Sequence, residues 1–242
     1  MKVKIITLNQ EPKRNRFYLN VKSIFAILDM FKIEKFTFNP LAENTLVIYE
    51  NGKAIVIDPG MYFKEEQVAF SSFLEDNGLT LEKIITTHCH LDHVAGVRYL
   101  QEKYKIPFLI PEDEQEILKM AEISAGMYGL NEFQVVEEFE IISKSEKTID
   151  LLGYEFQILF VPGHSPGHIA FYNKKSKVLI NGDVLFKGSI GRYDLPGGSL
   201  PVLANSIKNV LFGLPDDTVV YCGHGEETTI GFEKKYNMIN NL

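Results

Sequence analysis

All six histidines of this 242-residue chain lie in short segments that also hold aspartate, glycine or proline. They are His88, His90, His93, His164, His168 and His224. Histidines used as ordinary surface or core residues would be scattered, whereas imidazoles gathered beside carboxylates are typical of metal sites. The chain is therefore expected to fold so that these distant segments meet around a metal centre.

The densest of these segments is residues 87–93, which read THCHLDH. In an extended segment, residues two apart point to the same side, so His88 and His90 can bind one ion while the cysteine between them points away. Asp92 and His93 lie where the chain bends into an expected helix and can face a second ion. One short loop can thus serve two metals, and the missing ligands must come from elsewhere.

Further candidate ligands follow three later strands. His164 and His168 lie in VPGHSPGH, Asp183 ends the tripeptide NGD, and His224 lies in YCGHG. A glycine lies near each candidate, as expected where the backbone turns tightly around a compact site. Loops at strand ends of a rigid scaffold often carry catalytic residues.

Apolar runs alternate along the chain in two sets of strands, each accompanied by helices. Strands are expected from residue 31 and at 46–49, 54–57, 83–86, 107–110, 139–142, 147–151, 154–161, 168–172, 177–180 and 218–222. Helices are expected at 64–77, 94–105, 112–127, 199–211 and 232–240. Asn51-Gly52 predicts a hairpin, and the strands from 139 to 161 are expected to form an antiparallel run. This order predicts an α/β fold with two sheets packed face to face and helices outside.

Residues 1–29 are expected to be an N-terminal extension of uncertain role, and 30–242 a single domain. The start lacks the long apolar region and small-residue cleavage site of a secretory signal. Because Met30 directly precedes the domain, an upstream start assignment is an alternative interpretation. Mass spectrometry of the native N-terminus tests that alternative, and peptides containing Met1 would contradict it.

Composition narrows the expected partners and compartment. The 25 Lys+Arg against 32 Asp+Glu leave a formal charge of −7, so no broad cationic surface is available for nucleic acid. No apolar run is long enough to span a membrane. Two cysteines, Cys89 and Cys222, give no disulfide framework and suit a reducing compartment, so a cytoplasmic protein is expected. Both cysteines are expected to be packed residues rather than ligands.

Taken in order, these motifs resemble the metallo-β-lactamase superfamily. The resemblance covers residues 33–235 and rests on the HxHxDH signature with its downstream His, Asp and His. It implies an αββα four-layer sandwich with two divalent metal ions at one edge. Zinc is the first expectation, and iron or manganese are alternatives, since His/Asp sites accept all three.

The resemblance also implies a role for each candidate residue. Metal one would be bound by His88, His90 and His164, metal two by Asp92, His93 and His224, with Asp183 bridging both. Asp92 and Asp183 are also the candidate catalytic residues. Asp58 matches an acid that supports the loops. His168 is expected to hydrogen-bond behind the ligands, because a fourth imidazole would close the open position that a catalytic metal keeps.

Such a site predicts hydrolysis of an activated acyl bond. Two cations about 3.5–4 Å apart can share a hydroxide, which supplies a nucleophile near neutral pH. A bridging Asp183 resembles the glyoxalase II, lactonase and RNase Z branches more than true β-lactamases, and the acidic charge argues against RNA. Residues 186–198 resemble the short bacterial glyoxalase II-like group of hydroxyacylglutathione hydrolase homologues. The expected substrate is a small-molecule thioester or ester, such as an S-2-hydroxyacylglutathione.

The motifs do not select one substrate. Arg192 is a candidate to bind a substrate carboxylate through its guanidinium, and a role in stabilising its own loop is equally compatible. Full-length glyoxalase II holds glutathione partly through a C-terminal helical region, whereas this chain ends eighteen residues after His224. A smaller or different thioester is therefore an alternative.

Two other functions fit the motifs. A persulfide dioxygenase shares the scaffold but uses one iron, bound by two histidines and an aspartate. Its loop after the bridging aspartate resembles Gly-Cys-Gly-Arg, whereas residues 188–192 read GSIGR, which favours the hydrolase. A non-catalytic metal-binding domain is the third interpretation, and the complete ligand set argues against it.

Overall fold

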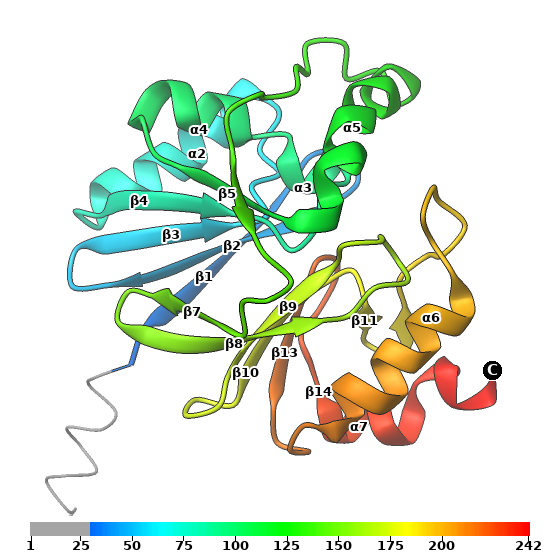
Figure 1. The fold of residues 1–242 in the computed structure, drawn as a ribbon. Helices are drawn as coiled ribbons and strands as arrows, with labels where there is room; N and C mark the ends of the chain where they lie inside the picture. The colour runs from blue at the N-terminus through cyan, green and yellow to red at the C-terminus, as the bar shows by residue number, and fades with distance from the viewer. Residues whose placement is uncertain (1–29) are drawn as a thin grey trace, which may run out of the picture. The chain divides into compact units, whose positions relative to one another are not determined.

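Residues 30–242 are described in a computed structural model of the protein, so the expectations for residues 1–29 lie outside the described residues. The described residues form two six-stranded sheets (Figure 1). The first sheet has the order β1-β2-β3-β4-β5-β6. Its strands are β1 (Lys32–Phe38), β2 (Glu43–Glu50), β3 (Lys53–Ile57), β4 (Thr80–Ile85), β5 (Phe108–Pro111) and β6 (Glu140–Ile142). β1 to β3 pair antiparallel, with the turn at Asn51-Gly52, and β3 to β6 pair parallel.

The second sheet has the order β14-β13-β10-β9-β8-β7. Its strands are β7 (Thr148–Leu151), β8 (Tyr154–Phe160), β9 (Ile169–Asn173), β10 (Val178–Gly182), β13 (Val219–Cys222) and β14 (Thr228–Thr229). All neighbours pair antiparallel except β10 and β13, which are parallel. A separate two-stranded ribbon, β11 (Leu185–Phe186) and β12 (Ser189–Ile190), follows β10 and was not expected from the sequence.

Helices cover the outer face of each sheet (Figure 1). Beside the first sheet are α2 (Lys64–Asp76), α3 (Leu91–Val94), α4 (Val97–Tyr104), the 3₁₀ turn η1 (Glu112–Glu114) and α5 (Gln115–Met127). Beside the second are α6 (Leu200–Asn205), which continues as a π turn η2 (Ser206–Val210) and a 3₁₀ turn η3 (Leu211–Gly213), then α7 (Ile230–Tyr236) and η4 (Met238–Asn241). Among residues 30–242, no helix is long and apolar enough to cross a membrane.

Alternation along the strands produces three stacked apolar layers. On β3, Ala54 and Val56 pack toward the helices of the first sheet, while Ile55 and Ile57 pack between the sheets. On β9, Phe171 faces the space between the sheets and Tyr172 faces the layer under α6 and α7. The expected α/β fold with four αββα layers is therefore confirmed.

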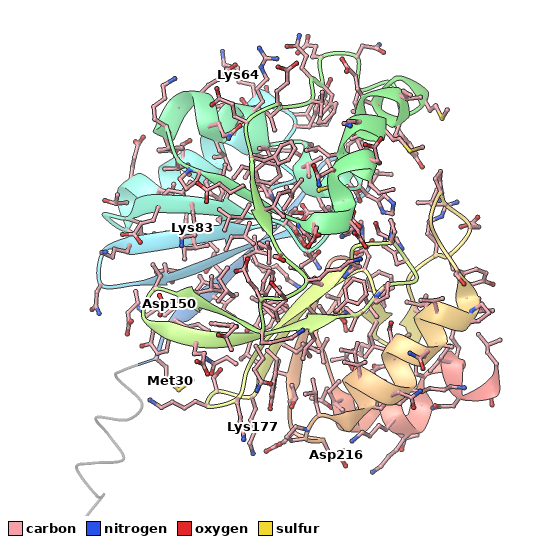
Figure 2. All side chains as sticks on the ribbon, viewed as in Figure 1. Met30, Lys64, Lys83, Asp150, Lys177 and Asp216 are labelled. Carbon is pink, nitrogen blue, oxygen red and sulfur yellow. The ribbon has the colours of Figure 1, made fainter. Side chains whose placement is uncertain are left out.

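Charged side chains at helix starts, in turns and on an outer strand lie at the periphery, as Lys64, Lys177, Asp216 and Asp150 illustrate in Figure 2. The polar groups that matter for function are instead buried where strands of both sheets end. Exposed charges of this kind are ordinary surface residues, whereas buried polar groups need a specific partner.

One expectation about the elements was wrong, and one helix begins later than expected. The strand at 139–142 does not join an antiparallel run, because β6 pairs parallel with β5, and the chain then crosses to the second sheet at β7. The five-residue connection between β6 and β7 would also suit a hairpin, so its length alone does not select the partner of β6. The helix expected at 94–105 is present as α4, which begins at Val97. A separate short helix, α3, precedes it, and between the two the N–H of Gly96 donates to the carbonyl of Pro59 at 2.8 Å.

Candidate metal centre

The candidate side chains follow strand ends in both sheets. Segment 86–90 comes after β4, 161–168 after β8, Asp183 after β10 and 223–225 after β13. Cross-connections hold these loops together. The N–H of Ile169 donates to the carbonyl of Thr87 at 3.0 Å, and the N–H of Asn44 donates to the carbonyl of Gly223 at 2.7 Å. Loops from two sheets thereby converge on one point.

A first group consists of three imidazoles. The Nε2 atom of His164 lies 2.8 Å from Nδ1 of His90 and 3.2 Å from Nε2 of His88. The other ring nitrogen of His164, Nδ1, donates to the carbonyl of Arg192 at 2.7 Å, which leaves Nε2 as the acceptor atom facing the group. Three ligand atoms this close together can hold a metal ion.

A second group consists of Asp92, His93 and His224. Oδ2 of Asp92 lies 3.1 Å from Nε2 of His224 and 3.7 Å from Nε2 of His93. Nδ1 of His224 donates to the carbonyl of Ala42 at 3.1 Å, so its Nε2 atom also faces inward. This group likewise can hold a metal ion.

Asp183 lies between the two groups. Its Oδ2 atom is 3.6 Å from Nε2 of His164 in the first group and 3.3 Å from Nε2 of His224 in the second. Its Oδ1 atom is 3.4 Å from Nε2 of His93. One carboxylate therefore reaches both groups, which is the placement that a bridging ligand needs.

Buried polar atoms indicate that these residues fit cations. Oδ1 of Asp183 and Nε2 of His93 are both buried, and neither makes a well-directed hydrogen bond within residues 30–242. A buried polar atom without a partner costs free energy, so such atoms are retained where a ligand satisfies them. Two aspartates and five histidines around one point are the donor set that divalent zinc, iron or manganese prefers.

Electrostatics differ between the two groups. Burial lowers the pKa of His90 to about 3, and burial with nearby His93 holds the pKa of His88 well below its usual range. Burial also opposes protonation of His224, but hydrogen bonds to Asp183 and Asp92 outweigh it and raise its pKa to about 10. The imidazoles of the first group are thus neutral and ready to bind a metal, whereas a cation in the second group displaces a proton.

Asp58 and His168 lie behind these groups. Asp58 accepts hydrogen bonds from Oγ1 of Thr86 at 2.9 Å and from the N–H of Thr87 at 2.6 Å, and its Oδ2 lies 3.2 Å from Nδ1 of His93. It could also form a ligand group with His88 and His93, but its oxygens already accept these loop hydrogen bonds. Nε2 of His168 accepts the backbone N–H of Asp183 at 3.1 Å, so this atom is already engaged behind the ligand groups.

Two glycines make room for this packing. Gly182 has a φ of +53°, and a Cβ there would lie 2.3 Å from Oγ1 of Thr87 and 2.8 Å from the ring of His168. A Cβ on Gly223 would lie 2.1 Å from Oδ1 of Asp183. Any side chain at either position would displace Asp183 or a residue that supports it.

Sequence reasoning missed two fully buried carboxyl groups beside the site. Oε1 of Glu43 lies 3.9 Å from Nδ1 of His93, and its Oε2 accepts Oγ1 of Thr45 at 2.8 Å. Glu114 accepts the N–H of Cys89 at 2.9 Å. No spacing signal marks either residue, since Glu114 lies in the acidic run PEDEQE, which is typical of an exposed helix start.

Glu114 joins the two loops that carry the first group. Besides the N–H of Cys89, it accepts Oγ of Ser165 and the N–H of Gly167, the latter at 2.7 Å. Burial raises the pKa of Glu114 to about 7, although hydrogen bonds from Ser165, Cys89 and Gly167 oppose this shift. The residue positions both loops without touching any of the seven candidate ligands.

This pKa shift predicts a pH-dependent stability. Because the folded pKa lies above the unfolded one, the carboxyl contributes stability at low pH that is lost as the pH rises through about 7. Between pH 5 and pH 8, the unfolding free energy of the metal-free protein should fall by about 2–3 kcal/mol more than that of Glu114→Gln. Urea unfolding at several pH values measures this, with the exposed Glu116→Gln as control. Parallel profiles for wild type and Glu114→Gln would contradict it.

Arg192 is already engaged within its own loop. Its Nε and Nη2 atoms donate to the two carboxylate oxygens of Asp194 at 2.8 and 3.0 Å. The backbone carbonyl of Arg192 accepts from His164. Arg192 borders the cavity over the candidate metal groups, but the charge of its guanidinium is compensated by Asp194.

A cavity of about 310 Å³ opens over both groups. Besides His90, Asp92, His164, Asp183 and His224, it is lined by Leu41, Leu91, Ser124, Tyr128, Phe186, Arg192 and Leu195. A larger depression of about 910 Å³ lies between α4 and residues 135–140, and none of the candidate ligands lines it. The smaller cavity is therefore the one that gives access to the candidate metal groups.

Comparisons with known proteins agree with this geometry. The profile of the Metallo-beta-lactamase superfamily matches residues 38–224. Hydroxyacylglutathione hydrolase GloC of Haemophilus influenzae is 34% identical over 207 residues, covering 85% of this chain and 96% of the relative. The crystal structure of BLEG-1 B3 metallo-beta-lactamase matches with a TM-score of 0.78 and 32% identity, covering 86% of this chain and 98% of that one.

A third similar protein was solved with metal bound. TTHA1623 in a di-iron-bound form matches with a TM-score of 0.71 and 34% identity, over 85% of this chain and 98% of that one. The chain belongs to the metallo-beta-lactamase superfamily, which confirms the resemblance noted from the motifs. It is thus a member of a metallo-hydrolase superfamily whose fold binds metal ions.

Proposed function

We propose that the protein is a dinuclear metal-dependent hydrolase of small-molecule thioesters, of which S-2-hydroxyacylglutathiones are examples. The observation that carries this proposal is the position of Asp183, whose carboxylate reaches His164 in one ligand group and His224 in the other. A carboxylate shared in this way is expected for two neighbouring ions rather than one.

The proposed ligands are those expected from the sequence. His88, His90 and His164 would hold metal one, Asp92, His93 and His224 metal two, and Asp183 both. Two bound divalent ions would supply a nucleophile from water near neutral pH and polarise the substrate carbonyl. Zinc is the first candidate, and iron and manganese are the alternatives.

The protein's own residues orient this site. Arg192 and Ala42 fix the rings of His164 and His224 through their carbonyls, and Asp58 lies against Nδ1 of His93. Such contacts set which ring nitrogen faces inward. In the reaction, an oxygen from water bonds to the acyl carbon, the carbon–sulfur bond breaks, and the thiolate takes up a proton. The products are a carboxylic acid and a thiol.

Similarity supports the hydrolase over other activities of the fold. GloC, named as a hydroxyacylglutathione hydrolase, aligns over nearly its whole length, 96%. The guanidinium of Arg192 already pairs with Asp194, so it is less available to bind a carboxylate of glutathione. We therefore do not assign glutathione as the leaving group. A cytoplasmic location and the lack of a nucleic-acid partner remain predictions from composition.

A direct assay tests the proposed reaction. Protein reconstituted separately with zinc, iron or manganese should hydrolyse S-D-lactoylglutathione or simpler acyl thioesters. The release of free thiol measures the rate of this reaction. Ester, lactone and β-lactam substrates should be turned over more slowly than the best thioester. If every thioester, lactone and β-lactam is inert with all three metals, the non-catalytic interpretation replaces this proposal.

A further inference from the structure

A narrow side cleft extends from the cavity over the candidate metal groups. Its volume is about 50 Å³, and it lies between α5 and the turn at Leu195-Pro196. We define the side cleft by Leu91, Ile117, Met120, Ala121, Leu195 and Pro196. Proposed ligand His90 lies at its inner end, because it lines both the side cleft and the main cavity.

The side cleft adjoins the cavity over the candidate metal groups. Leu91, Ser124 and Leu195 border both the main cavity and the side cleft. In the binding mode inferred here, a substrate whose carbonyl lies at the candidate metal groups extends one arm past His90 into the cleft. The rest of the substrate remains in the main cavity, whose volume of about 310 Å³ is several times larger.

The walls of the side cleft are apolar and carry no charged side chain. Ile117 and Ala121 are buried on the inner face of α5, and Leu91 is 4% exposed. Ser124 is the one hydroxyl at the border, and its Oγ already donates to the carbonyl of Met120 at 3.2 Å. An arm bearing a carboxylate or ammonium group would lose its hydration there without gaining a partner, so an alkyl chain fits best.

The size of the side cleft limits the length of that chain. One water molecule needs about 10–15 Å³ of cavity volume. The cleft of about 50 Å³ therefore takes roughly three to five heavy atoms. Three or four of these atoms match the carbons beyond the carbonyl of a butanoyl or pentanoyl group. Each methylene that is buried strengthens binding by about fourfold.

We propose that the side cleft binds the acyl chain of the substrate, so the preferred substrates are thioesters of short aliphatic acids with four or five carbons. This inference rests on the proposed thioester hydrolysis and specifies its substrate class. Ala121 is the specificity-determining residue in this proposal, because its small side chain lines the cleft.

A chain-length series tests the preference in the metal-reconstituted, full-length protein. Acetyl, butanoyl and octanoyl thioesters of N-acetylcysteamine share one leaving group and differ only in the acyl chain. We expect kcat/KM to rise roughly tenfold from acetyl to butanoyl and to fall again at octanoyl. A flat or steadily falling series overturns the inference, even though thioester hydrolysis itself would then be established.

A variant localises the effect to the side cleft. In Ala121→Leu the added side chain fills the cleft, so the butanoyl-to-acetyl ratio of kcat/KM should drop from roughly ten to about one. Glu122→Leu, an exposed neighbour on α5, adds the same side chain outside the cleft and should keep the wild-type ratio. An unchanged ratio in Ala121→Leu overturns the assignment.

Binding of carboxylates separates this inference from the proposed function and does not require turnover. Calorimetric titration of the metal-loaded wild type should show butanoate binding roughly tenfold more tightly than acetate. Equal affinities overturn the cleft assignment whatever the activity. Tighter butanoate binding in a protein inert toward all thioesters would uphold the cleft and refute the hydrolase.

Discussion

Replacing Asp183 by alanine is expected to lower the rate of thioester hydrolysis by about a thousandfold or more. A loss of this size corresponds to about 4 kcal/mol of transition-state stabilisation, within the several kcal/mol that metal ions supply to charged transition states. Asp183 is the residue whose carboxylate lies within 3.6 Å of proposed ligands in both groups, so its removal affects both proposed ions.

Steady-state assays and metal analysis of Asp183→Ala measure this effect together. Asp183→Asn keeps the size of the side chain and loses its charge, so it should also bind less metal. Asp76→Ala, which removes an exposed carboxylate at the end of α2, is the matched control and should behave as wild type. Near-normal turnover by Asp183→Ala would refute the dinuclear mechanism.

Removal of metal should abolish activity and destabilise the fold. A ligand present at 100 times its dissociation constant stabilises the folded state by about 2.7 kcal/mol, so two such ions contribute about 5 kcal/mol. For a domain of this size, that corresponds to a fall in Tm of roughly 10–20 °C on chelation. The physical reason is that Asp92 and Asp183, both buried, lose the cations that compensate their charge.

Thermal unfolding with and without a chelator measures this shift, and re-addition of metal should restore both Tm and activity. Asp58→Asn should lose metal at lower chelator concentrations than the wild type, because the wild-type carboxylate of Asp58 lies against Nδ1 of His93. The expected loss of metal affinity is about 10- to 100-fold. If chelation leaves both Tm and turnover unchanged, the seven side chains are not metal ligands.

Much of the fold could be predicted because its local patterns are strong. Alternation on β3 assigns Ile55 and Ile57 to one face, and Asn51-Gly52 marks the hairpin before it. The pairing of β6 could not be predicted, since a three-residue strand has no pattern that selects a partner. In the structure β6 pairs with β5, from Leu109 to Pro111, and not with β7.

The candidate site was predictable to the extent that it consists of unusual residues. Histidines beside aspartates at strand ends stand out, and the structure brings all seven expected ligands together. Glu43 and Glu114 could not be found, because an isolated glutamate is ordinary until the fold buries it. The pairing of Arg192 with Asp194 could not be predicted either, because the spacing of the two residues does not specify this contact.

The metal content of active, purified protein tests the central claim most directly. We predict two divalent ions per chain, with thioester hydrolysis rising in proportion as the second ion is added. One iron per chain, together with oxygen uptake on glutathione persulfide and no thioester hydrolysis, would contradict the account and identify a persulfide dioxygenase.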